Sequence, residues 1–256
     1  PKDIILGIIR KIGTGGGAGH VIEYVGDVIQ NMSMENRMTI CNMSIEGGAR
    51  AGMIAPDEVT FNYLKEKNYA PKGSDWNDAI AEWGNLYSDE DAEFDKVVTI
   101  NADELEPSIS WGTNPSQVIF INDTIPHPDD FNEESEKEAA SRALEYMDLK
   151  PGEKINEIQL DRVFIGSCTN GRIEDLREAA EVVKGKKVSS TIGAMIVPGS
   201  TLVKKQAEEE VNAWPVGECA RSPWCRHRYD RHRYGRHKRS QSPSRRAARR
   251  SNRPWA

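Results

Sequence analysis

The order of apolar and polar residues over the first 210 positions predicts helices that alternate with short strands. Apolar residues recur at helical spacing in residues 2–12 and 173–183. Compact apolar runs of strand type fall at 97–100 and 163–166, the second expected to be buried. This alternation is typical of a layered α/β fold with a largely parallel sheet. We also expect helices at 34–53, 56–67, within 70–93, 135–147 and 201–210, and strands at 20–28, 118–121 and 194–197.

The pattern divides the chain into two units and a tail. A polar linker near residues 84–93 separates a first α/β unit, 1–93, from most of a second, 94–210. Beyond 210 the periodicity stops, and after residue 214 no aliphatic side chain larger than Ala occurs apart from Val216. Such a segment buries too little apolar area to offset its chain entropy. We therefore expect residues 211–256 to be disordered.

Charge separates the same two parts. Residues 1–210 carry 21 Lys and Arg against 38 Asp and Glu, a net charge of −17, whereas residues 211–256 carry 13 against 2, a net charge of +11. The tail is an out-of-frame translation, a fusion to a basic segment, or a nucleic-acid-binding arm whose Arg, Tyr and His contact phosphates and stack on bases. We favour the first, because the tail has 12 Arg and 1 Lys.

Several classes of protein are disfavoured. No apolar run approaches the roughly 20 residues of a membrane helix. The chain starts at Pro1 without an initiator Met or a signal-peptide pattern, and we expect it to begin inside a longer protein. The four cysteines show no spacing typical of a secreted disulfide framework, which indicates the cytoplasm: Cys41, Cys168, Cys219 and Cys225.

A glycine-rich segment at residues 13–19 resembles a nucleotide-binding loop only in composition. A dinucleotide loop would need glycine where Ala18 stands, and a P-loop would end in Gly-Lys-Ser/Thr, whereas the chain continues as Gly19-His20-Val21. We interpret the segment as a tight turn between a helix and a strand.

Cys168 is the first candidate for chemistry. The strand at 163–166 leads through Ser167 and Cys168 into a turn and then a helix. This places Cys168 at the carboxyl end of a strand, where open α/β sheets form their ligand crevice, and the helix that follows favours a thiolate. Cys168 therefore suits a metal ligand or a nucleophile, although a buried structural cysteine is the alternative.

Asn42 and Glu46 form the second candidate. They are four residues apart and would share one face of the helix expected at 34–53. An amide and a carboxylate among small residues could bind a polar ligand. The alternative is an exposed or capping pair.

Taken together, these segments resemble the aconitase family. Residues 166–170 (Gly-Ser-Cys-Thr-Asn) with 172–176 are similar to its first cluster-cysteine segment, and 197–200 and 38–43 are similar to other parts of it. Residues 44–58 resemble the large subunits of bacterial-type 3-isopropylmalate dehydratases more than aconitase itself. The resemblance extends from residue 1 to about 210.

The resemblance implies aconitase-like α/β/α domains and a [4Fe–4S] cluster held by three cysteines, whose open iron acts on the substrate. It makes Cys168 the first ligand, places Asn42 and Asn170 beside the cluster or substrate, and makes Glu46 the catalytic candidate. The implied reaction interconverts 2- and 3-isopropylmalate in leucine biosynthesis, with a separate small subunit completing the site. Homoaconitase and citramalate-type hydro-lyases are the related alternatives.

The sequence also departs from the family. Its other two ligands lie in a Pro-Gly-Cys-x-x-Cys segment, whereas Cys219 and Cys225 are six residues apart without that context. An amino-terminal Asp-Ser-His segment and a downstream arginine segment have no counterpart. We expect a fragment truncated at both ends and inactive alone. The rival hypothesis is a non-catalytic nucleic-acid-binding protein that uses the tail.

Overall fold

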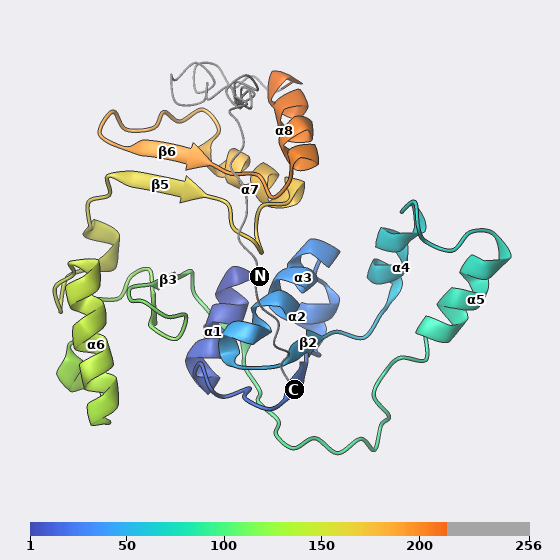
Figure 1. Cartoon of the computed structure of the whole chain (residues 1–256), viewed down its shortest axis with the longest axis horizontal. Coiled ribbons are helices and arrows are strands. Elements are labelled where there is room, and N and C mark those ends of the chain that lie inside the picture. Colours follow the sequence, from blue (N-terminus) through green and yellow to red (C-terminus); the bar gives the residue numbers. More distant parts are fainter. Residues whose placement is uncertain (214–256) are drawn as a thin grey trace, which may run out of the picture.

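The computed structural model describes residues 1–213, which form three groups of helices and short strands and one projecting arm (Figure 1). The first group lies at the centre of the view, and the arm stands out to its right. The first group contains α1 (Lys2–Ile12), β1 (Val21–Glu23), α2 (Asp27–Gln30), α3 (Met34–Met43), the 3-10 turn η1 (Ser44–Gly47) and β2 (Ala51–Met53). The arm consists of α4 (Glu58–Lys65) and α5 (Ser74–Trp83).

The second and third groups follow an extended segment, residues 84–101, that has no helix or strand. The second group contains η2 (Ala102–Glu104), β3 (Ser108–Ser110), β4 (Val118–Phe120), η3 (Pro128–Asp130), α6 (Glu134–Met147) and η4 (Ile155–Glu157). The third contains β5 (Arg162–Ile165), α7 (Ile173–Val183), β6 (Gly193–Ile196) and α8 (Thr201–Ala213). Within residues 1–213, no helix is long and apolar enough to cross a membrane.

Each group pairs two strands. β1 runs parallel to β2 with Val21 opposite Ala51, and β5 runs parallel to β6 with Phe164 opposite Met195. Of the three strand pairs in residues 1–213, only β3 with β4 is antiparallel. The expected α/β fold with mostly parallel pairing is therefore confirmed.

Two hydrophobic clusters hold the first and second groups together. In the first, the apolar face of α1, with Ile5 and Ile9 fully buried, packs against Ile40 of α3. The second forms where the small face of α6 meets the strands and loops beside it. Its buried members are Trp111, Ile119, Ile125, Ala140, Ala143, Leu144 and Ile155.

The third group is less covered. Phe164 is 58% exposed and Met195 opposite it is 56% exposed, so the expectation of a buried strand at 163–166 is wrong. The apolar run predicted a strand correctly, but burial alternates along it: Val163 and Ile165 are half-buried, whereas Phe164 is exposed.

Most of the expected elements are present, with four corrections. The strand expected at 20–28 is only Val21–Glu23, and α2 already begins at Asp27. The helix expected at 34–53 ends at Met43, because the chain tightens into η1 and Gly48 then takes a left-handed φ of 87°, which stops a helix. Residues 97–100 form no strand, and β3 at 108–110 was not expected. The division at residue 93 stays a prediction. Residues 211–256 were expected to be disordered. Residues 211–213 instead belong to α8, and residues 214–256 lie outside the described part of the chain.

Candidate functional site

Cys168 lies at the tip of a tight loop that leaves the carboxyl end of β5. Gly166 opens this loop with a φ of 127°, and a Cβ there would collide with the carbonyl oxygen of Val197. The Ser167 amide donates to the Asn170 carbonyl at 2.8 Å, and the Asn170 amide donates to Ser167 Oγ at 2.8 Å. The turn therefore closes around Cys168 and leaves its side chain exposed.

The loop rests on α3. Asn170 Nδ2 and Arg172 Nη1 both donate to Thr39 Oγ1, at 3.2 and 3.3 Å. Lys2 Nζ donates to Thr169 Oγ1 at 3.1 Å. The cysteine loop thus binds two helices of the first group, although more than 120 residues separate them in sequence.

Asn170 has its side chain held between protein groups. Its Nδ2 also donates to Asp175 Oδ1 at 3.0 Å, and its Oδ1 accepts from Thr169 Oγ1 at 3.3 Å. Asp175 in turn accepts from the Arg172 amide at 2.9 Å and so caps the start of α7. In this arrangement Asn170 braces the loop beside Cys168.

Asn42 and Glu46 lie on the first group and are both exposed. Asn42 is in the last turn of α3, whereas Glu46 is in η1, where each residue turns by about 120° instead of about 100°. The two side chains therefore diverge from the single helical face that the sequence predicted. Within residues 1–213 neither side chain forms a hydrogen bond or an ion pair, so both are available to a ligand, and no hydrogen bond connects Glu46 to the Cys168 loop.

A pair of carboxylates lies at the same contact. Ser33 Oγ, at the start of α3, donates to Glu174 Oε2 of α7 at 3.2 Å. Burial raises the pKa of Glu174, and the neighbouring Glu35 carboxyl raises it further, whereas the Ser33 hydrogen bond lowers it. The sequence did not predict the roles of Thr39, Glu35 and Glu174, because no local pattern predicts contacts between residues so far apart in the chain.

Cys41 lies away from this loop. It is half-buried against the first hydrophobic cluster, and burial raises the pKa of its thiol, although Arg37 lowers it. Among residues 1–213, Cys168 is the one exposed cysteine, and no group of three His, Cys, Asp or Glu is placed to hold a metal ion. Cys168 fits the role of a single cluster ligand, but the described residues do not by themselves supply the three that a cluster needs.

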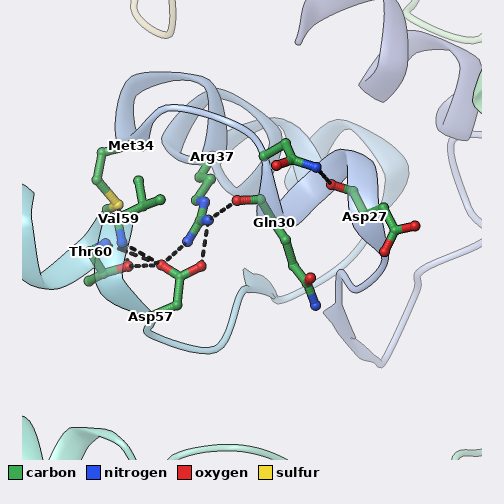
Figure 2. Close-up of polar contacts among 8 residues, drawn as sticks. Asp27, Gln30, Met34, Arg37, Asp57, Val59 and Thr60 are labelled. Carbon is green, nitrogen blue, oxygen red and sulfur yellow. Dashed lines mark hydrogen bonds and ion pairs between the residues drawn. The ribbon is translucent and has the colours of Figure 1, made fainter.

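The helix that carries Asn42 is anchored from its buried side by an ion pair (Figure 2). Arg37 is 2% exposed, and its Nη1 and Nη2 donate to the two oxygens of Asp57 at 2.7 and 2.6 Å. Nη2 also donates to the Gln30 carbonyl at 2.7 Å. Hydrogen bonding to Arg37 holds the pKa of Asp57 below its usual range, although burial opposes this. Asp57 also caps α4 by accepting from the amides of Val59 and Thr60 at 3.0 and 3.2 Å.

Comparison with known families accounts for the described part of the chain as a whole. A model described as "Aconitase family (aconitate hydratase)" matches residues 1–214. The match includes the Cys168 loop, α3 and both hydrophobic clusters.

Proposed function

The chain belongs to the aconitase family, a family of hydro-lyases, and from that membership we propose that it is part of the large subunit of a cytoplasmic 3-isopropylmalate dehydratase. The observation that carries the proposal is the exposed Cys168, presented at the carboxyl end of β5 by a loop bound to α3. The preference for isopropylmalate over citrate, homocitrate or citramalate-type acids rests on the likeness of residues 44–58.

We assign Cys168 as one ligand of a [4Fe–4S] cluster. When bound, such a cluster supplies a Lewis-acidic iron for the substrate hydroxyl and carboxylate. The thiol suits this role because it is exposed, whereas Cys41 packs against the core with a raised pKa. The two remaining ligands would have to come from outside residues 1–213.

Asn42, in the last turn of α3, and Glu46, in η1, would serve the substrate. Both side chains are exposed and without hydrogen bonds in the described structure, so an amide and a carboxylate are free to bind or to exchange a proton with a polar ligand. Asn170 would hold the Cys168 loop in place, because its Nδ2 donates to both Thr39 and Asp175.

A second polypeptide is the partner we propose. Cys168, Asn42 and Glu46 are all open to solvent, whereas dehydration chemistry benefits from a site that excludes water. A small subunit that binds over these residues would exclude water from them. Co-purification of a full-length version as an active single chain would contradict the partner.

Anaerobic reconstitution tests the ligand assignment. We expect the 256-residue chain, given iron and sulfide, to retain fewer than about four irons and to have no dehydratase activity, because one thiolate leaves most irons of a cubane open to water. The number of irons bound per chain should fall in Cys168→Ser and stay unchanged in the matched variant Cys41→Ser. About four irons retained in Cys168→Ser would rule out the ligand role.

The substrate is tested separately. A full-length version combined with its small subunit should interconvert 2- and 3-isopropylmalate faster than it turns over citrate, homocitrate or citramalate, as followed by absorbance of the unsaturated intermediate. A preference for one of the other acids would overturn the substrate assignment and leave the family unchanged.

A further inference from the structure

The contact between the Cys168 loop and α3 consists of polar groups. The first hydrophobic cluster draws on residues 4–54 and Val118, and the second on residues 109–158. Among the described residues, neither cluster reaches β5, the loop or α7. Hydrogen bonds therefore connect the loop to the first group without a shared hydrophobic cluster.

The hydroxyl of Thr39 is the centre of these bonds. Thr39 is fully buried, with 0% of its surface exposed. Its Oγ1 donates toward the carbonyls of Glu35 and Thr169, at 3.1 and 3.4 Å, and accepts from Asn170 Nδ2 and Arg172 Nη1. A hydroxyl has one proton and two lone pairs, so every site on this oxygen is used.

Thr39 also has a defined place relative to the candidate site. It is one helical turn before Asn42 on α3, and residues three apart on a helix are neighbours on its surface. Two of its partners, Thr169 and Asn170, directly follow Cys168 in the chain. One oxygen thus connects the loop that carries the thiol to the helix that carries the amide.

From this geometry we propose that Thr39 is a positioning residue, whose hydroxyl sets the Cys168 loop against α3 at the spacing that the site requires. The proposal rests on the proposed function for the role of Cys168. Arg172 is secondary, because it also donates to the Thr169 carbonyl at 2.6 Å and so remains bound within the loop without Thr39.

The test compares three variants of the full chain by amide hydrogen exchange and mass spectrometry. Thr39→Val keeps the shape and removes the hydroxyl, Thr39→Ser keeps the hydroxyl, and Thr60→Val makes the same exchange on α4 as a control. We expect Thr39→Val to speed exchange in residues 166–172 about tenfold, since buried hydrogen-bonding groups lose their partner. Thr39→Ser and Thr60→Val should stay near the wild-type rate.

Exchange in residues 2–12 separates local loosening from unfolding. It should stay at the wild-type rate in Thr39→Val, because α1 belongs to the first cluster. Faster exchange of α1 in Thr39→Val would show that Thr39 stabilises the whole first group, and it would overturn the proposal. Wild-type exchange of the loop in Thr39→Val, or loosening of the loop in Thr39→Ser, would overturn it too. The readout needs neither iron nor substrate, so a failed dehydratase assay leaves it standing.

Discussion

Removing the Asp57 carboxylate should destabilise the protein through the charge it leaves behind. The Arg37 side chain is 3% exposed, and without the carboxylate its buried charge would have only neutral partners, such as the Gln30 carbonyl. Breaking a buried pair from one side costs about 3–5 kcal/mol, and the 25% exposure of the Asp57 side chain reduces the cost below this range. We expect Asp57→Asn to lose about 2–3 kcal/mol, and Asp57→Ala about 1 kcal/mol more because the cap of α4 is lost too.

The stability lost in Asp57→Asn should also depend on pH, in a direction that follows from the pKa of Asp57. The pKa of Asp57 is lowered in the folded protein, first by the Arg37 hydrogen bonds. A carboxyl whose pKa is lowered by folding contributes stability that is fully present above its pKa in the unfolded chain, about 3.9. This stability is lost as the pH falls through the pKa in the folded protein. The difference between wild type and Asp57→Asn should therefore be constant from about pH 5 to 7 and shrink below about pH 4.

Urea denaturation followed by circular dichroism measures both effects. The matched control is Glu138→Gln, which breaks an ion pair with Arg142 of 3.3 Å whose side chains are 63% and 70% exposed. That change should cost less than about 0.5 kcal/mol. A loss in Asp57→Asn as small as in the control, or one that persists undiminished at pH 3, would refute the reasoning.

Two further predictions concern the cysteine loop. Gly166→Ala should speed amide exchange in residues 166–172 and cost about 1–3 kcal/mol, because the left-handed backbone and the Val197 carbonyl leave no place for a Cβ; wild-type stability and exchange would show that the loop does not need this geometry. At pH 7, iodoacetamide should label Cys168 at least about tenfold faster than Cys41, which is half-buried with a raised pKa, as followed by peptide mass spectrometry. Equal labelling rates would contradict the placement of Cys41 against the core.

Local patterns predicted the elements whose signals are local. The spacing of apolar residues over 2–12 predicted α1, and the helix expected at 56–67 is present as α4. The strand before Cys168 was predicted for the same reason. The end of α3 was not, because the glycines at 47 and 48 suggested close packing of a longer helix, whereas Gly48 adopts a left-handed conformation that ends it.

The candidate site was predictable only in part. The position of Cys168 at the end of β5 follows from the strand–turn–helix order, which a single sequence shows. The binding of its loop to Thr39 depends on how two distant segments meet, and no periodicity encodes that. Phe164 illustrates the same limit, since its apolar character predicted a strand correctly and its burial wrongly.

β4 couples the two hydrophobic clusters. Successive side chains of a strand point to opposite faces, and Val118 enters the first cluster whereas Ile119 enters the second. A strand shared in this way transmits loss of packing from one side to the other, so heat should melt both clusters in one cooperative transition. The layer of β5, β6 and α7, which reaches them through polar contacts, is free to open at a lower temperature, and calorimetry would then record two transitions from one chain.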